Sequence, residues 1–384
     1  MDLTMKPVLE LQAGLWSGKT TSRELTEQAL ARIKDPDGEG SRAFLAVHEE
    51  AALVAADASD RLRAQGVVPS PLAGIPVSLK DLFDEQGQQT LAGSKSLEGS
   101  APATKDSIVT ARLRAAGAVL VGRTNLTEFA YSGLGLNCHY DTPRNPWDRE
   151  TGRIPGGSSS GAGVSVADGM CAVAIGTDTG GSVRIPSALN GVTGFKTSTG
   201  RIPLDGVYPL SSTLDSIGPL APTVTCCIVT DAILDGRTPV VPRALPIENL
   251  RFGIPQDYVL NDLDDHVAST FEGTLEALSR AGATITEVNS SMYEEIPAAM
   301  PNGGILGAEA FPSPAAHGRI QGQLRSARLG PYPPGREPLG GGPDRLPPDS
   351  RRYPGPRRGN GDALRCAADA DLRDGRPGHR AARQ

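Results

Sequence analysis

Apolar residues recur at helical spacing from about residue 7 to residue 66, which predicts a layer of helices near the start of the chain. Thr21 and Glu24 have the spacing of a capping box, and the segment LTEQALARIK behind them is amphipathic. A second helix is predicted over residues 48–64. Nothing in this stretch indicates chemistry, and we interpret it as a packing layer.

Short apolar runs then alternate with helical patterns. Residues 75–79 predict a buried strand that ends at Lys80, and residues 118–122 predict another. Between them, Asp106 is the predicted N-cap of a helix that Gly117 ends. Such alternation is typical of an α/β layered domain.

The same pattern continues to about residue 288. Further strands are predicted at residues 170–175, 250–255 and 283–288. Further helices are predicted at residues 162–168, 183–190 (interrupted by Pro186) and 266–282. Turn residues dominate 201–222, and a loop over 124–136 is placed to line a pocket.

The character of the chain changes after about residue 311. Residues 312–384 are rich in arginine, proline and glycine, contain no lysine and have almost no apolar periodicity, so they cannot bury enough surface to fold. We therefore expect a folded domain over 1–311 and a separate tail over 312–384. The tail is either a natural disordered segment or the product of a frameshift in a GC-rich gene, which would leave the domain incomplete at its C-terminal end.

Composition narrows the function classes. The chain has 384 residues, enough for a large core, and its net charge of −6 and 4% aromatic content argue against binding nucleic acid or an anionic membrane. Five scattered cysteines with no CxxC or Cys/His ligand spacing indicate neither a disulfide framework nor a zinc site. No signal pattern or membrane-length apolar run occurs, so a cytoplasmic location is expected.

Candidate chemistry is concentrated in residues 154–197. This stretch holds two glycine–serine loops, GGSSSG and DTGGS, which present hydroxyls beside free backbone N–H groups. Acyl transfer needs that combination, a nucleophile next to an oxyanion hole. Upstream, Lys80 follows an apolar run, where burial could lower its pKa and make it a base near neutral pH.

Together these segments resemble the amidase signature family of serine hydrolases. The resemblance is dense from about residue 70 to 225 and looser to about 300, and it rests on GIPVSLKD, GAVLVGRTN, NPWD, GGSSSG, GTDTGGSVRIPSALNGVTGFK and LDSIGP. It implies an α/β/α sandwich with a mixed central sheet flanked by helices. A small departure is Lys196-Thr197-Ser198, where the family commonly has Lys-Pro-Thr.

The resemblance also implies roles for individual residues. Lys80 takes the place of the base, Ser158 that of a bridging serine that follows a cis peptide bond, and Ser182 that of the nucleophile. The implied oxyanion hole is formed by the backbone N–H groups of Thr179, Gly180, Gly181 and Ser182. Tyr131 and Gly157 are expected to contact the substrate. Ser159, Asp178 and Arg184 are expected to support the loops. No metal or organic cofactor is implied.

Other motifs fit single loops only. GSSSG matches the G-x-S-x-G elbow, with Ser159 as nucleophile, but the downstream histidines are poorly placed for a triad. Asp178-Thr179-Gly180 matches an aspartic-protease tripeptide without the second one that this chemistry needs. The lysine of a phosphate-binding loop and the S-x-x-K arrangement are both absent.

The expected activity is hydrolysis of a small-molecule carboxylic amide to an acid and ammonia or amine. Two alternatives stay open: the A subunit of a glutamine-dependent aminoacyl-tRNA amidotransferase, and an inactive truncated remnant. The expected partner is a small-molecule amide, with no nucleic acid and no membrane, and a homodimer is left open. The sequence does not reveal which amide is the substrate.

Overall fold

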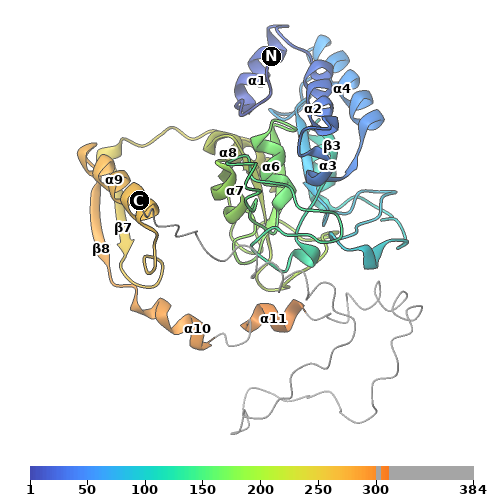
Figure 1. Cartoon of the computed structure of the whole chain (residues 1–384). Coiled ribbons are helices and arrows are strands. Elements are labelled where there is room, and N and C mark those ends of the chain that lie inside the picture. The colour runs from blue at the N-terminus through green and yellow to red at the C-terminus, as the bar shows by residue number, and fades with distance from the viewer. Residues whose placement is uncertain (300–303, 311–384) are drawn as a thin grey trace, which may run out of the picture.

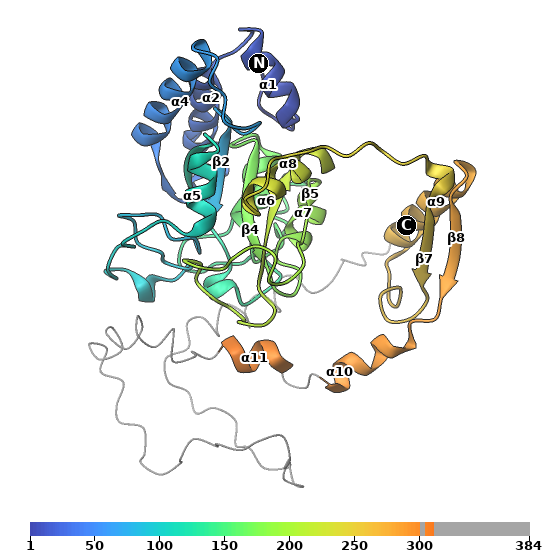
Figure 2. The ribbon, with the colours of Figure 1, turned by 180° about the vertical axis from the view of Figure 1, so that it is seen from behind.

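The computed structural model describes residues 1–299 and 304–310. Six strands form one mixed sheet in the order β1-β3-β2-β4-β6-β5 (Figures 1 and 2). The strands are β1 (Phe44–Val47), β2 (Pro76–Lys80), β3 (Val119–Thr124), β4 (Val173–Asp178), β5 (Thr193–Gly194) and β6 (Ser216–Ala221). β2 pairs in parallel with β3 and β4, whereas the pairs β1–β3, β4–β6 and β5–β6 are antiparallel. The predicted mixed sheet is confirmed.

Helices cover both faces of this sheet. They are α1 (Val8–Trp16), α2 (Ser22–Lys34), α3 (Gly40–Ala43), α4 (Glu49–Ala64), α5 (Ile108–Ala115), α6 (Ser160–Ala167), α7 (Arg184–Asn190) and α8 (Val224–Leu234). α5 joins β2 to β3, and α6 joins β3 to β4. These two connections run in opposite directions along the sheet, so right-handed crossovers place the two helices on opposite faces. Thr21 and Glu24 form the predicted capping box at the start of α2.

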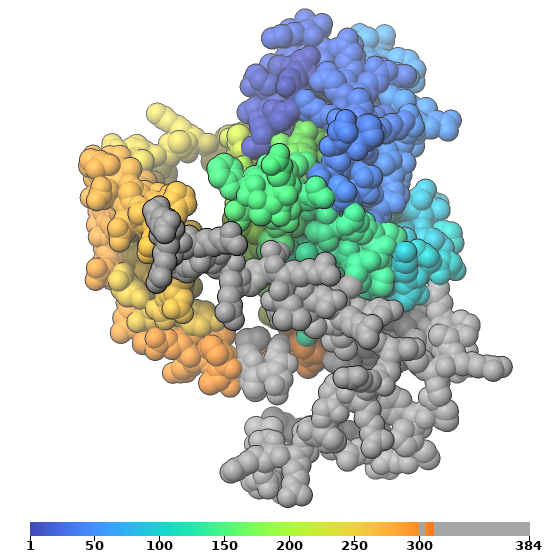
Figure 3. Space-filling model, viewed as in Figure 1, coloured from blue at the N-terminus to red at the C-terminus, as the bar shows by residue number. Residues whose placement is uncertain are grey.

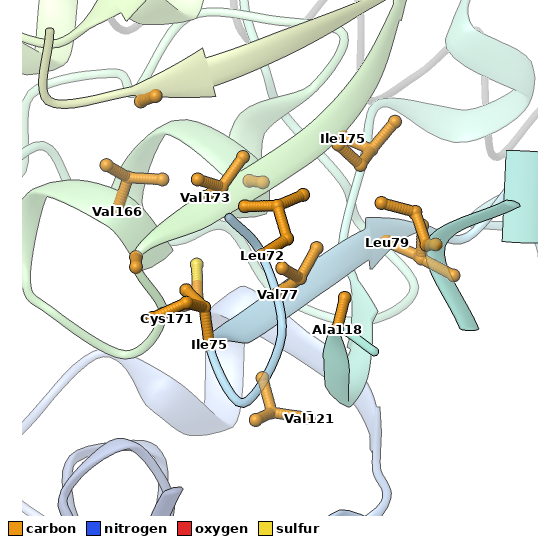
Figure 4. Close-up of a cluster of buried hydrophobic side chains, with 14 of the residues drawn as sticks. Leu72, Ile75, Val77, Leu79, Ala118, Val121, Val166, Cys171, Val173 and Ile175 are labelled. Carbon is orange, nitrogen blue, oxygen red and sulfur yellow. The ribbon is translucent and has the colours of Figure 1, made fainter. Parts of the chain in front are cut away.

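The core is centred on the parallel strands. All residues of β2, β3 and β4 are buried, as expected for strands with neighbours on both edges and helices on both faces. Val77 of β2 lies beside Val173 of β4, and Leu72 and Ile75 extend the same cluster (Figure 4). This apolar packing fixes the carboxyl ends of β2 and β4 side by side.

A smaller unit follows the body of the chain. It consists of β7 (Arg251–Pro255) and β8 (Thr284–Val288), paired in parallel, with α9 (Asp265–Arg280) as the crossover helix. Figures 1 and 3 show it as a lobe beside the body. The helices α10 (Ile296–Ala299) and α11 (Gly304–Ala310) come after it. No helix in the described part is both long and apolar enough to span a membrane.

Four short 3-10 helices complete the described elements. They are η1 (Lys95–Leu97), η2 (Glu128–Ala130), η3 (Ile247–Asn249) and η4 (Ser291–Glu295). The predicted tail over 312–384 lies outside the described residues, so neither interpretation of it is tested.

Four strands were wrongly placed or not predicted, and one of them, the two-residue β5, has no counterpart among the predicted strands. β4 begins at Val173 and runs to Asp178, later than the predicted 170–175, because its pairing with β6 extends to that residue. β6 lies where turns were predicted, since Gly218 interrupts its apolar pattern. That glycine is required by packing, because a Cβ there would be 2.0 Å from Phe195 O. β1 was hidden inside the predicted helical layer.

Two helix starts and one predicted helix interruption also differ from the structure. Ser107, not Asp106, caps α5 by accepting from Thr110 N, while Asp106 accepts from Gln86 N and Arg114 instead. α6 begins at residue 160, two residues earlier than predicted. Pro186 does not interrupt α7, because it is the third residue of the helix, where a backbone N–H has no intrahelical partner to lose.

Candidate active site

The predicted site lies at one edge of the sheet. Lys80 is the last residue of β2, and Thr177 and Asp178 end the neighbouring parallel strand β4. Carboxyl ends of parallel strands meet at the same edge, and ligands bind where successive connections leave in opposite directions. The connections that leave β2 and β3 do so here, so the sheet topology itself brings these residues together.

Lys80 is fully buried and makes two side-chain hydrogen bonds. Its Nζ donates to Ser158 Oγ at 2.8 Å and to Thr177 Oγ1 at 2.9 Å. Burial lowers the pKa of Lys80 to about 7, and the negative charges of Asp215 and Asp178 oppose this effect only in part. A substantial fraction of the amine is therefore unprotonated near neutral pH and can accept a proton.

The GGSSSG loop positions Ser158 through its backbone. The Gly157–Ser158 peptide is cis, which confirms the expectation drawn from the family resemblance. Ser158 O accepts from Thr127 N at 3.1 Å and from Ser160 N at 2.9 Å. Gly157 is packed against the neighbouring loop, because a Cβ at this position would be 2.5 Å from Gly135 N. The glycine is thus explained by close backbone approach.

The DTGGS turn is built around Asp178. One carboxylate accepts from the backbone N–H groups of Gly181, Val183 and Arg184 and from two nitrogens of the Arg184 side chain. Burial alone would raise the pKa of Asp178, but Arg184 and the backbone donors hold it below its ordinary value. These contacts agree with the supporting roles predicted for Asp178 and Arg184.

Ser182 lies on this turn, nearer the surface than the other two residues. Ser182 is 6% exposed, whereas Ser158 and Lys80 are 0% exposed. The two serine loops are joined by a bond from Ser159 N to Ser182 O at 3.2 Å. Among the described contacts, no hydrogen bond joins the hydroxyls of Ser158 and Ser182. The structure therefore pairs Lys80 with Ser158 directly and places Ser182 on the adjoining loop.

Of the four predicted oxyanion donors, one is already engaged. Gly181 N donates to Asp178 Oδ1 at 2.8 Å, which leaves the N–H groups of Thr179, Gly180 and Ser182 to be considered for this role. Gly180 is exposed and a Cβ there would meet no atom within 4 Å, so the turn borders open space at this residue. An oxyanion hole formed by these three N–H groups stays a prediction.

Comparison with known proteins bears on this arrangement. The model of the Amidase family matches residues 24–314. The chain belongs to the amidase family.

Two relatives of known name are each 40% identical to this amidase-family chain where they align with it. The first is the 2-amino-5-chloromuconic acid deaminase of Comamonas testosteroni, matched over 257 residues, which are 66% of this chain and 55% of the deaminase. The second is the A subunit of the glutamyl-tRNA(Gln) amidotransferase of Chloroflexus aggregans, matched over 288 residues, which are 72% of this chain and 58% of that protein. The chain thus spans less than two thirds of the length of these relatives.

Solved amidase structures share the fold. One amidase crystal structure superposes with a TM-score of 0.69 at 34% identity, covering 86% of this chain and 78% of that one. The native peptide amidase of Stenotrophomonas maltophilia superposes with a TM-score of 0.68 at 31% identity, covering 84% and 71%. The α/β amidase architecture expected from the sequence is confirmed.

The loop over residues 124–136, predicted to line a pocket, lies against the GGSSSG loop. Gly157 N donates to Gly133 O at 2.7 Å, and Phe129 and Ala130 hold positive φ angles of 52° and 61°, which are unusual for residues with a side chain. Tyr131 follows them and is 51% exposed. Substrate contact by Tyr131 or Gly157 stays a prediction.

Sequence reasoning missed two polar partners of the site. Thr177 contacts Lys80, and Asp215 accepts from Thr179 Oγ1 at 2.5 Å. Both lie in segments quoted for the family resemblance, GTDTGG and LDSIGP, but only the pairing of β2, β4 and β6 brings them to the site. The sequence signal was present without the register needed to interpret it.

A cavity of about 500 Å³ lies elsewhere, between α4 and α5. Its lining includes Ala55, Leu62, Leu120 and Arg114 and none of the predicted catalytic residues. In the described part of the chain, no group of three or more His, Cys, Asp or Glu side chains is arranged to hold a metal ion.

Proposed function

We propose that this protein hydrolyses a small-molecule carboxylic amide to an acid and ammonia or an amine, with Ser182 as the nucleophile. The observation that carries the proposal is the buried Lys80 amine, hydrogen-bonded to Ser158 and with its pKa lowered by burial to about 7. A lysine held in this state is suited to general-base chemistry rather than to ion pairing. The folded catalytic unit is proposed to extend over residues 1–311.

In the first half-reaction, neutral Lys80 donates to Thr177 and accepts the proton of Ser158 through its lone pair. Ser158 Oγ in turn takes the proton of Ser182 as Ser182 Oγ attacks the amide carbonyl carbon. The tetrahedral intermediate collapses when the proton returns through Ser158 to the leaving nitrogen and the C–N bond breaks. An acyl ester on Ser182 and a free amine result.

In the second half-reaction, water replaces the amine. Its proton passes to Ser158 and Lys80 while its oxygen attacks the ester carbonyl, and the acid leaves as the proton returns to Ser182. The Ser158–Ser182 contact required in both steps forms in the substrate complex, where catalytic hydrogen bonds commonly tighten. The N–H groups of Thr179, Gly180 and Ser182 stabilise the oxyanion, each by about 3 kcal/mol.

Fluorophosphonate labelling tests this proposal without knowledge of the substrate. The expected result is one adduct on Ser182, located by intact mass and peptide mapping. The adduct should be lost in Ser182→Ala and in Lys80→Ala. The exposed residues Ser198 and Lys105 provide matched controls, and Ser198→Ala and Lys105→Ala should label like the wild type. An adduct on another serine, or none on the folded protein, would contradict the proposal.

A second candidate is the A subunit of a glutamine-dependent aminoacyl-tRNA amidotransferase. It is favoured by the 40% identity to a protein named as the A subunit of glutamyl-tRNA(Gln) amidotransferase. This role predicts glutaminase activity and co-purification with a partner protein. Hydrolysis of simple amides without glutaminase activity would instead favour the free-standing amidase.

The third candidate, an inactive remnant, makes a different prediction. A domain without part of its fold leaves sheet edges and apolar faces uncovered, so its unfolding would not be cooperative. A single cooperative transition in a melting curve would argue against this alternative.

A further inference from the structure

A chain of hydrogen bonds leads from the DTGGS turn to a distant helix. Thr179 Oγ1 donates to Asp215 Oδ1 at 2.5 Å, and the other oxygen of Asp215 accepts from Leu210 N at 2.9 Å and Ser211 N at 3.1 Å. Asp215 is buried. Its carboxylate therefore closes the turn over residues 210–215 and ties that turn to Thr179.

The same turn is held from its other side by α11. Glu309 accepts from Ser211 Oγ, from Thr213 N at 3.1 Å and from Thr213 Oγ1 at 3.0 Å. Ser211 is itself fully buried and contributes to both ends, with its N–H on Asp215 and its hydroxyl on Glu309. A residue 98 positions away in the chain thus completes the turn.

Apolar packing fixes α11 in this place. Leu306 and Ala310 lie on the face of α11 that also carries Glu309, because residues three and four apart share one side of a helix. Both pack against a buried cluster that includes Leu210 and Ala130. Carboxylate and apolar contacts therefore act together to seat α11 against the turn.

We propose that Asp215 and Glu309 form a two-carboxylate clamp that positions Thr179, and with it the oxyanion turn over residues 178–182. Both are positioning residues, since neither contacts the reacting atoms. The effect of the clamp on catalysis rests on the proposed function, whereas its effect on the turn does not. The clamp assigns α11 a role at the active site although it lies far along the chain.

Hydrogen–deuterium exchange tests the clamp independently of activity. In Glu309→Ala, amides in a peptide over 176–184 are expected to exchange at least ~3-fold faster than in the wild type, because the turn loses its outer support. Glu309→Gln should stay near the wild type. Its carbonyl oxygen can accept from Ser211 and Thr213 N, and its amide can donate to the Thr213 hydroxyl. Glu295→Ala, an exposed acid in η4, is the matched control.

A second pair of variants tests the Thr179 hydroxyl alone. Thr179→Val removes the donor to Asp215 at nearly constant shape and should also speed exchange over 176–184. Thr179→Ser keeps the hydroxyl, so its exchange over 176–184 should match that of the wild type. These variants leave α11 untouched, so they test the clamp if Glu309→Ala does not fold. Unchanged exchange over 176–184, or a change confined to 209–215, would overturn the proposal.

Fluorophosphonate labelling of the same variants separates the two proposals. If Ser182 is the nucleophile, Glu309→Ala and Thr179→Val should be labelled about tenfold or more slowly, as expected for a displaced oxyanion donor, and Glu309→Gln within about twofold of the wild type. A wild type that is not labelled, with exchange altered as described, would overturn the proposed function and support the clamp. Normal labelling of Glu309→Ala with unaltered exchange would overturn the clamp alone.

Discussion

Two units of this chain have the same strand–helix–strand layout and very different burial. β2–α5–β3 and β7–α9–β8 are both parallel strand pairs joined by a crossover helix. Every residue of β2 and β3 is buried, whereas only Ile254 is buried in β7 and no residue of β8 or α9 is. The local pattern alone therefore does not decide how deeply such a unit is packed.

The difference comes from the neighbours of each unit. β2 has β4 on its second edge, and α6 covers the face opposite α5, whereas β7 and β8 form a sheet of two strands. Two strands with one helix leave most of their residues in contact with solvent here, and no residue of β8 or α9 is buried. Only the first unit can hold a desolvated amine, so the chemistry of this amidase-family chain depends on the larger sheet rather than on the repeated motif.

The largest expected effect concerns that amine. Lys80→Met should lower the rate of fluorophosphonate labelling by about a thousandfold or more, because the base is removed. Labelling of the wild type should rise with pH through about 7, since Lys80 must lose its proton to act. Lys105→Met, at an exposed lysine, should change neither property. A pH-independent wild type between pH 5 and 9 would contradict the role of Lys80.

The same substitution should stabilise the fold. Folding lowers the pKa of Lys80 from about 10.4 to about 7, so the unfolded chain binds the extra proton between these values. The free-energy cost of burying the charged Lys80 amine is therefore present in full below pH 7 and disappears as pH rises toward 10. The hydrogen bonds that Lys80 makes to Ser158 and Thr177 are lost in the variant, and this loss offsets part of the gain. Urea unfolding should therefore show Lys80→Met about 2 kcal/mol more stable than wild type at pH 7. Near pH 10 that penalty is gone and only the lost hydrogen bonds remain, so Lys80→Met should there be about 2 kcal/mol less stable than wild type. A variant that is already less stable than wild type at pH 7 would refute this account.

The next effect is a loss of stability in the body. Gly161 lies in α6, and a Cβ there would be 2.2 Å from Ala43 O and 2.7 Å from Asn125 N, both backbone atoms. Gly161→Ala is expected to lower the free energy of unfolding by about 3 kcal/mol or more, because neither neighbour is a flexible side chain. Denaturant unfolding monitored by circular dichroism measures it. A change below about 1 kcal/mol would show that the packing around α6 is looser than described.

A paired truncation compares the two units directly. Val77 of β2 is 0% exposed and Val288 of β8 is 45% exposed. Val77→Ala should cost about 2 kcal/mol of unfolding free energy, from lost burial and the cavity left behind. Val288→Ala should stay within about 0.5 kcal/mol, as for other surface positions. Equal costs at the two positions, measured by urea unfolding, would mean that β8 is buried in solution.

Some features of this structure can be predicted from the sequence, and others cannot. The strand at Lys80, the α4 and α9 helices and the two glycine–serine loops follow from local patterns, and the family resemblance placed Lys80 and Ser158 together. Local patterns do not encode partners, however. The contacts of Thr177 with Lys80, and of Asp215 with Thr179, require the register of β4 against β2 and β6.

Errors at element ends have a similar origin. Asp106 and Ser107 are both good N-caps, and the choice between them is made by Gln86 and Arg114, which engage Asp106 from other parts of the chain. The attachment of Glu309 to Ser211 is a more extreme case, since nothing near either residue in the sequence indicates it. Long-range polar contacts are the part of the site that local reasoning misses.

The smallest expected effect has the opposite sign. Gly273 lies inside α9, as Gly161 lies inside α6, but a Cβ at Gly273 would meet no atom within 4 Å. With no clash to offset it, the higher helix propensity of alanine should raise the stability of α9 by about 0.5–1 kcal/mol. Amides in α9 are expected to exchange faster than those in α6, so hydrogen exchange can measure this change. In Gly273→Ala, the exchange of α9 amides should slow by about two- to fivefold. A destabilising Gly273→Ala would mean that another surface covers α9 at this residue. The two units would then differ in which partner covers them rather than in how deeply they are packed.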